Sequence, residues 1–328
     1  MNSYNQSSLK KNFSTISSNG TYSSDFCNEL LVINTIYLRE SLSGLGFILN
    51  LFCTYIFFKI IRNIKANIDL YKYFLLESII NSYICLRIML KNVFDCKNCE
   101  IEKYYAMKVI LWFFFYYVDY SLELMSIMIS VMSGFNRYRS IDNFLNVFDK
   151  IPFFLVNSLV AIFCGVFCAY KLFDITIETT MKNNSTYATY YLKSNKLGQT
   201  ALVFDQMYTL IRDAIPIFAI LLLNILTMIK IKKTMKKKEI VTRRKKRLKD
   251  SNTELRLNLM VVVTSSIVLL SHLANFIFWL KVFETNECFN LLRNFLYWTS
   301  YGINFFIYLF FNLKFQIYFI NLIPVKRL

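Results

Sequence analysis

The chain has 328 residues and a formal net charge of +17 at pH 7, and 55% of its residues are hydrophobic and 17% aromatic. This composition is typical of a helical bundle in lipid and argues against a water-soluble globule. We do not interpret the positive charge as a nucleic-acid signal, because the sequence has no soluble basic domain to carry such a site.

Apolar stretches of spanning length recur along the chain. A membrane-spanning helix needs about 20 mostly apolar residues, and the polar segments between the stretches are too short to form a separate soluble domain. A soluble helix would carry a polar stripe, which segment 151–170 almost entirely lacks. We therefore predict an all-α fold, a seven-transmembrane helix bundle. Its spans are expected at 34–61, 68–91, 106–135, 151–173, 203–231, 257–281 and 288–311.

The distribution of lysine and arginine predicts the orientation of this bundle. Cytoplasmic segments carry an excess of these residues. With the N-terminus outside, the inner segments hold 21 Lys and Arg residues and the outer segments hold 7. The inner segments are then 62–67, 136–150, 230–256 and 312–328, and the outer ones are 1–33, 92–105, 174–202 and 282–287. We expect a multi-pass protein of the plasma membrane with its N-terminus outside.

Segment 1–33 is predicted to be an extracellular glycosylated tail. The first 25 residues are polar, so we expect no cleavable signal peptide, and the first span would serve as the signal anchor. Sequons for N-glycosylation support the same orientation, because all of them fall in outer segments. They are centred on Asn5, Asn12, Asn19, Asn183 and Asn184.

The cysteines fall into two groups. Those within the spans are expected to pack as small apolar residues, and they are Cys53, Cys85, Cys164 and Cys168. Those in outer segments are expected to form disulfides, and they are Cys27, Cys96, Cys99 and Cys288. Three connectivities are possible, one of which joins Cys27 to Cys288 and Cys96 to Cys99. A zinc site at Cys96-x-x-Cys99 is the weaker interpretation, because no second pair of ligands accompanies it. We expect no metal and no other cofactor.

Two short motifs lie at the predicted cytoplasmic ends of spans three and seven. Span three ends in Asn136-Arg137-Tyr138, and span seven carries Asn304 and Tyr308, with Phe315 following. In these motifs the chain resembles the rhodopsin-like G-protein-coupled receptors, which end span three in acid-Arg-Tyr and span seven in Asn-Pro-x-x-Tyr. Two further residues fall where that family has helix markers, namely Asn50 in span one and Pro216 in span five.

The resemblance implies a signalling switch at the cytoplasmic end. Arg137 would be held by an acid of a neighbouring helix and released on activation. Because Asn136 is neutral, Glu254 before span six is the expected acid. The alternative is that Arg137 only anchors span three to lipid headgroups. Asn304 and Tyr308 lie one turn apart on one helix face and would exchange hydrogen-bond partners, or else they are satisfied packing residues.

The sequence also departs from the family pattern. Span six reads Leu270-Ser271-His272-Leu273-Ala274 where the family has Cys-Trp-x-Pro, and Phe305 replaces the proline of span seven. The loop 174–202 has no cysteine, so the family's usual bridge from span three to this loop cannot form. We therefore predict a divergent member of the family.

Ionisable residues within the spans are costly and usually mark function. Glu77, with Asn50 nearby, lies where the family has a sodium site, and the alternative is a glutamate that is paired with a hydroxyl. Asp119 and Glu123 lie one turn apart in the outer half of span three. They are candidates to bind a basic group of a ligand.

The alternative is that Asp119 and Glu123 pair within the bundle. Their expected partners are Arg87 of span two and Arg212 of span five, which we count among the ligand-binding candidates in either case. His272, the only histidine, is expected to be a polar packing residue rather than a ligand.

Two cytoplasmic features complete the prediction. The basic run 230–249 is expected to meet anionic lipid of the inner leaflet on one face and a G protein on the other. Residues 312–320 are expected to form a short amphipathic helix on the membrane surface. The receptor domain is then 34–311, and residues 312–328 form a short cytoplasmic tail.

The expected function is that of a receptor that binds an extracellular peptide and activates a heterotrimeric G protein. The form of span seven is similar to that of invertebrate FMRFamide-like neuropeptide receptors and related nematode chemoreceptors. An amine or chemosensory receptor of the same fold is the alternative. A transporter or channel would show broken helices and two related halves, which fits poorly with 7 glycines and 3 prolines. An enzyme is not expected, because the sequence has no nucleophile motif.

Overall fold

A computed structural model describes residues 37–63, 68–94, 104–142, 151–173, 175–181, 188–194, 198–241, 246–280 and 287–322. The predicted tail 1–33 and the final residues 323–328 lie outside these ranges. So do all five predicted glycosylation sites and three of the outer cysteines, which are Cys27, Cys96 and Cys99.

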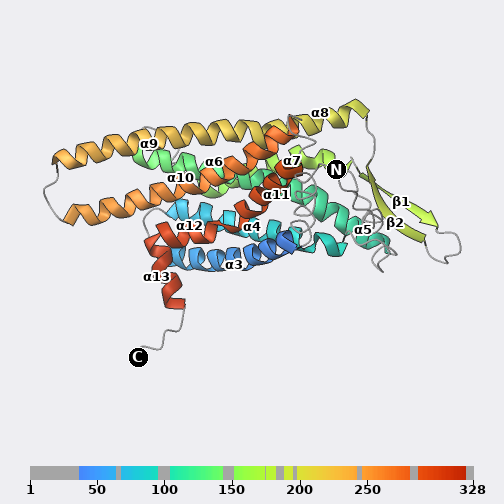
Figure 1. Cartoon of the computed structure of the whole chain (residues 1–328), viewed down its shortest axis with the longest axis horizontal. Coiled ribbons are helices and arrows are strands. Elements are labelled where there is room, and N and C mark those ends of the chain that lie inside the picture. The colour runs from blue at the N-terminus through green and yellow to red at the C-terminus, as the bar shows by residue number, and fades with distance from the viewer. Residues whose placement is uncertain are drawn as a thin grey trace, which may run out of the picture.

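The described part of the chain is a bundle of long helices that run nearly side by side (Figure 1). The first four predicted spans correspond to α3 (Arg39–Asn63), α4 (Ile68–Phe94), the joined segments α5 (Tyr105–Trp112), η4 (Phe113–Val118) and α6 (Asp119–Asp142), and α7 (Phe153–Cys168) with the short η6 (Ala169–Leu172). The last three correspond to α8 (Gly198–Thr209), η7 (Leu210–Ala214) and α9 (Ile215–Val241), then α10 (Lys246–Trp279), and finally α11 (Glu287–Gly302) with α12 (Asn304–Phe311). The short α13 (Leu313–Leu322) follows.

Six of these helical segments are long and apolar enough to cross a membrane, and the number is seven if α12 and α13, which meet at 104°, count as one bent span. A helical bundle suited to a membrane is therefore confirmed. The seventh predicted span is divided between α11 and α12, which are separated by Ile303. The side of the membrane on which the N-terminus lies stays a prediction.

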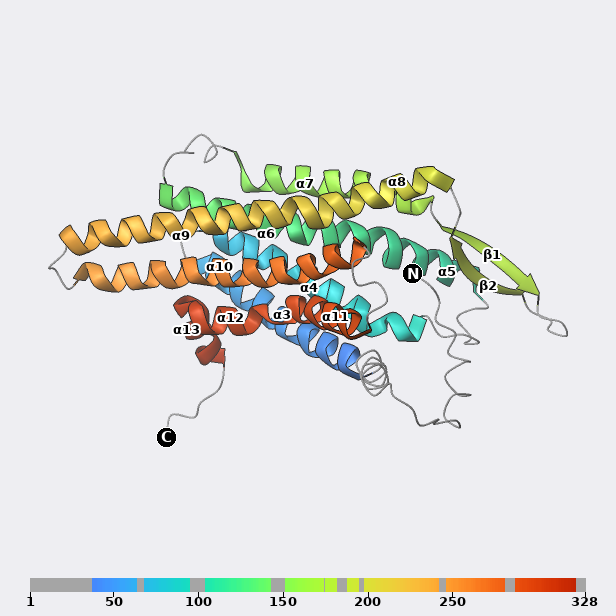
Figure 2. The ribbon, with the colours of Figure 1, turned by 45° about the horizontal axis from the view of Figure 1, so that its top comes forward.

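A β-hairpin is the one departure from the predicted all-α fold within the described residues. β1 (Ile175–Met181) and β2 (Ala188–Ser194) pair antiparallel, with Ile175 opposite Ser194 and Met181 opposite Ala188. Their threonine, isoleucine and tyrosine residues favour strands. The hairpin contacts α5 and projects from one end of the bundle (Figure 2). We call this the hairpin end and the opposite end the α13 end.

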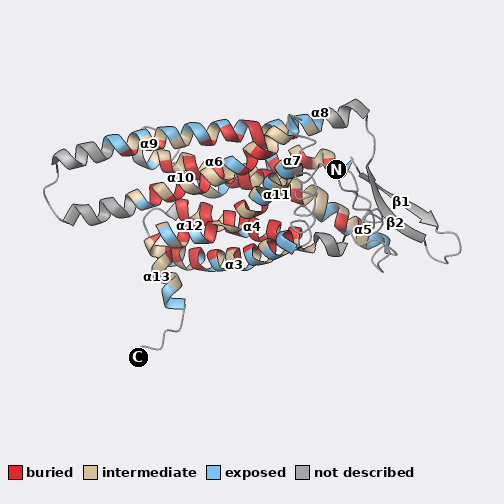
Figure 3. Cartoon of the chain, in the orientation of Figure 1, coloured by how far each residue is buried: buried red, intermediate tan, exposed pale blue. Residues whose placement is uncertain are grey.

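Burial follows the bundle geometry (Figure 3). α7 is the least buried of the spanning helices, and outward side chains such as Phe154 and Val166 are 81% and 72% exposed. Exposed apolar side chains are expected where a helix faces lipid. The α13 end has an aromatic core, in which the rings of Phe57 and Tyr308 are 4.9 Å apart and those of Phe57 and Phe315 are 5.3 Å apart.

α13 has the two-sided character predicted for residues 312–320. Phe315 is completely buried against the bundle, whereas Ile317 and Ile320 are 57% and 59% exposed. The helix turns sharply away from α12. An apolar face that the bundle leaves uncovered at this position fits a helix that lies along a membrane surface.

α3 and α11 approach each other through glycine. A Cβ atom added at Gly46 would lie 3.3 Å from the Cα of Gly302 and 2.9 Å from the sulfur of Cys85, so a larger residue would push the helices apart. Beside this contact, Asn50 donates hydrogen bonds to the carbonyls of Gly46 and Tyr301, both at 2.8 Å.

The break between α11 and α12 forms without proline. In an unbroken helix the Tyr301 carbonyl would accept from the backbone N–H of Phe305, the donor that a proline there would remove. Asn50 donates to this same carbonyl from α3. A side chain of the first span thus supplies a hydrogen bond at the place where the family pattern uses proline.

Candidate functional site

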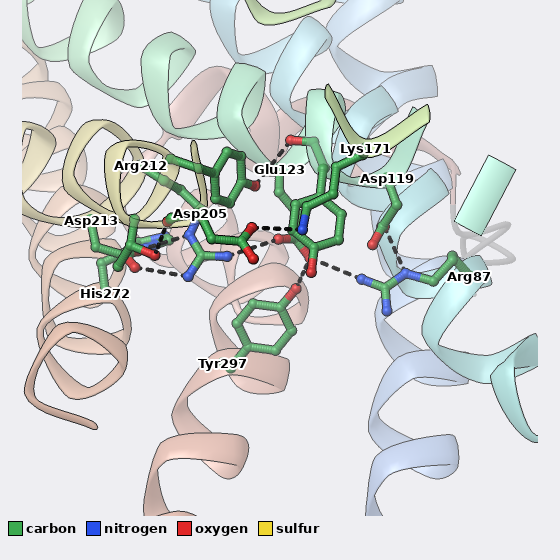
Figure 4. Close-up of polar contacts among 12 residues, drawn as sticks. Arg87, Asp119, Glu123, Lys171, Asp205, Arg212, Asp213, His272 and Tyr297 are labelled. Carbon is green, nitrogen blue, oxygen red and sulfur yellow. Dashed lines mark hydrogen bonds and ion pairs between the residues drawn. The ribbon is translucent and has the colours of Figure 1, made fainter. Parts of the chain in front are cut away.

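A cluster of charged side chains lies between the helices in the half of the bundle nearer the hairpin end (Figure 4). It includes both acids of span three, and five separate parts of the chain contribute to it. Its members, the charged cluster, are Arg87 of α4, Asp119 and Glu123 of α6, Arg212 and Asp213 of η7, His272 of α10 and Tyr297 of α11.

Glu123 is the centre of the charged cluster. Its Oε1 atom accepts from Arg87 at 2.9 Å and from the hydroxyl of Tyr297, and its Oε2 atom accepts from Arg212 at 3.4 Å. Arg87 also donates to Asp119 at 2.7 Å. The structure therefore has the internal pairing of these acids and arginines, which was one of the two alternatives in the sequence analysis. The four predicted ligand-binding residues lie together.

Asp213 extends the cluster towards α10. It accepts from Arg212 twice, at 3.0 and 2.8 Å, and its Oδ1 atom lies 2.7 Å from Nδ1 of His272. Asp213 is completely buried, so these partners replace its hydration. His272 packs inside the bundle as predicted, but as part of an ionic network. The sequence reasoning missed Asp213, although its position within a span was a sufficient signal.

Two π-helical segments border the charged cluster. η4 ends immediately before Asp119, and η7 contains both Arg212 and Asp213. A π segment inserts an extra residue into a helix and changes the direction of the side chains that follow, and such segments often occur at functional sites. Both helices therefore carry an irregular turn where their charged side chains enter the bundle.

A second ion pair lies beside the cluster, between η6 and α8. Lys171 is 2.7 Å from Asp205, which also accepts from the hydroxyl of Tyr170 at 2.9 Å. The ammonium group of Lys171 lies 4.6 Å from the ring centre of Tyr120. The Asp205 side chain is half exposed, so this pair lies at the edge of the bundle. The sequence did not single out either residue.

A set of polar residues lies deeper in the bundle, closer to the α13 end. Glu77 of α4 accepts from Asn304 at 3.2 Å, from Tyr308 at 3.3 Å and from Ser130 of α6 at 3.5 Å. The sequence had assigned Glu77 and Asn304 to separate sites, and the structure joins them. Asn50, the predicted companion of Glu77, instead bonds to backbone carbonyls.

The third polar contact lies near the α13 end. Arg137, which is 3% exposed, donates through Nε to the side-chain oxygen of Asn258 on α10, and through Nη1 to Ser140 at 3.4 Å. Asn136 accepts from Arg139 at 2.9 Å and Tyr138 is partly buried. The side chain of Glu254, the predicted partner of Arg137, lies outside the described residues. Asn258 is one helical turn after it.

The structure describes some of the cysteines on which the sequence predictions were made. Cys288 at the start of α11 is disulfide-bonded, and its partner lies outside the described residues. The four cysteines predicted to pack within spans are buried and free. No group of three or more metal-binding side chains occurs in the described part of the chain.

Comparisons with known proteins do not assign this chain to a family. No family model matches the sequence, and no curated protein is significantly similar to it. The resemblance to rhodopsin-like receptors therefore rests on the residues quoted above.

Proposed function

We propose that this chain is a receptor of the plasma membrane, with its N-terminus outside, that binds an extracellular ligand and activates a heterotrimeric G protein. The observation that carries the proposal is the set of polar contacts along α6. Glu123 bonds to α4, η7 and α11 near the hairpin end, and Arg137 bonds to α10 near the α13 end. Ser130 lies between them and contacts Glu77.

This arrangement supports signalling because contacts at the two ends share the same helices. A ligand that rearranges the charged cluster would change how α6 sits against α10 and α11. The contact between Arg137 and Asn258 would then open and free the cytoplasmic ends of the helices for a partner. The ligand needs only to bind one of two bundle states better than the other.

The proposed partner surface lies at the α13 end. α9 and α10 extend beyond the rest of the bundle there and lie side by side (Figures 1 and 2). The described parts of the basic run 230–249, at the end of α9 and the start of α10, fall on this extension. A G protein on one face and anionic lipid on the other fit its charge. A neuropeptide is the first ligand class to test, and amine or chemosensory ligands are the alternative.

The test is a second-messenger assay in cells that express the chain with a promiscuous G protein. We expect a ligand-dependent response to members of a library of peptides, amines and organic acids. The Arg137→Ala variant should bind the same ligand at matched surface expression and give a strongly reduced response. Ligand-dependent currents or substrate flux without any G protein would instead identify a channel or transporter.

A further inference from the structure

We infer that the ligand carries an acidic group, and that Arg293 binds this group at the entrance to the charged cluster. The inference rests on the proposed function, because it names the ligand class of the same site. It starts from an arginine that the sequence did not single out.

Arg293 lies on the inner face of α11. It is one turn before Tyr297, which bonds to Glu123, and residues one turn apart share a helix face. The neighbours Leu292 and Phe295 mark the outer face, because they are 49% and 40% exposed. Since α11 runs away from the hairpin end, Arg293 lies about 6 Å nearer that end than Tyr297.

Arg293 differs from the two arginines of the charged cluster in its partners. Arg87 and Arg212 each bond to two carboxylates. Among the described residues, Arg293 has no carboxylate within ion-pair distance, and its one hydrogen bond is to the side-chain oxygen of Asn294 at 3.0 Å. An anion from outside the described part of the chain would give Arg293 the kind of ion-pair partner that Arg87 and Arg212 already have.

The guanidinium group of Arg293 is also oriented by an aromatic ring. Its central carbon lies 3.9 Å from the ring centre of Phe278 on α10. Stacking covers one face of the guanidinium plane and leaves the N–H groups at its edge, which suit a carboxylate or phosphate that binds through two oxygens. Phe278 offers apolar surface for the rest of such a ligand.

A basic ligand meets a less favourable site. It would have to compete with Arg87 and Arg212 for Asp119 and Glu123, which are already bonded to them. Displacing a bonded guanidinium leaves a buried charge without its partner, which is costly. An acidic ligand needs no such displacement.

The experiment uses the purified full chain in phosphatidylcholine nanodiscs without any G protein. Three probes of matched shape are compared by their saturable shift of the unfolding temperature: 3-phenylpropionate, 3-phenylpropylamine and 3-phenylpropanol. We expect the acid to bind most tightly. Arg293→Gln should weaken its binding at least about tenfold, as expected for loss of a charge-assisted contact. Arg256→Gln, at an exposed arginine of α10, is the matched control and should leave binding unchanged.

Three results would overturn the inference. They are preference for the amine, equal loss of acid binding in both variants, or loss of acid binding when phosphatidylserine is added, since a lipid headgroup would then occupy Arg293. The proposed function fails separately. Acid binding at Arg293 with no second-messenger response in cells would refute the G-protein receptor and keep the acidic site. A response to basic ligands that Arg293→Gln leaves unchanged would refute the acidic site and keep the G-protein receptor.

Discussion

Replacing Glu123 by alanine tests whether the charged cluster is one connected unit. The change removes the acceptor of Arg87 at 2.9 Å, of Arg212 at 3.4 Å and of the Tyr297 hydroxyl. Two arginines, whose side chains are 13% and 18% exposed, are then left with one carboxylate partner each. The folded protein should therefore lose the stability that the three contacts of Glu123 contribute.

Breaking a buried ion pair by removing one partner costs about 3–5 kcal/mol. Because each arginine keeps a second carboxylate, we expect a loss of about 3 kcal/mol. At roughly 2 °C per kcal/mol, the unfolding temperature of the purified protein should fall by about 6 °C. Asp69→Ala is the control, because among the described residues the ion pair that it breaks is the exposed one with Lys72, at 3.0 Å, and this change should cost less than about 1 kcal/mol.

The double variant of Glu123→Ala with Arg87→Ala isolates the pairwise contribution. Residues in direct contact show interaction energies of about 0.5–3 kcal/mol in such cycles. The double variant should therefore be more stable than the sum of the two single losses predicts, by at least about 1 kcal/mol. Losses that add to within about 0.5 kcal/mol would refute the direct pairing, whatever the size of each single effect.

Three further predictions concern the membrane topology, the signalling switch and the hydrogen bond between Tyr308 and Glu77. A glycosidase should increase the gel mobility of the expressed protein, and an epitope tag within 230–256 should be detected only in permeabilised cells; detection in intact cells would reverse the orientation. Glu254→Ala should raise ligand-independent signalling. A loss of about 1.4 kcal/mol from the stability of the resting state would raise the active population roughly tenfold while it stays minor. Basal signalling equal to that of the unmodified chain, at matched surface expression, would exclude Glu254 as the restraint on Arg137. Tyr308→Phe keeps the ring packing but removes the hydroxyl that bonds to Glu77, so it should cost about 1 kcal/mol; an unchanged unfolding temperature would show that this hydrogen bond adds no net stability.

The helical bundle could be predicted because the apolar runs are long and span-length helices dominate any structure in lipid. The hairpin was not predicted, because strands of seven residues in a polar loop carry no strong turn signal. The division of the last span was missed for another reason. The hydrogen bond that accompanies the break comes from Asn50, 251 residues away from Tyr301 in the sequence.

Several individual residues of the candidate sites could be predicted from the sequence, but the contacts between them could not. The cost of a charge in a membrane identified Glu77, Asp119 and Glu123 individually. Their partners depend on how each helix is rotated, which the π-helical turns η4 and η7 change locally. The contact of Glu77 with Asn304 spans 227 residues, so no local pattern could show it. Arg293 lies within the predicted span 288–311, so its position alone was a sufficient signal, as it was for Asp213.

The hydrogen bond from Asn50 to the Tyr301 carbonyl has a consequence for sequence variation. Position 305 is phenylalanine here, and proline at this position would free the same carbonyl by a different route. A relative with proline at 305 could break its last helix without help from the first span. Because this chain lacks that proline, substitution of Asn50 should be tolerated less well here than in a relative that has both Asn at position 50 and proline at position 305.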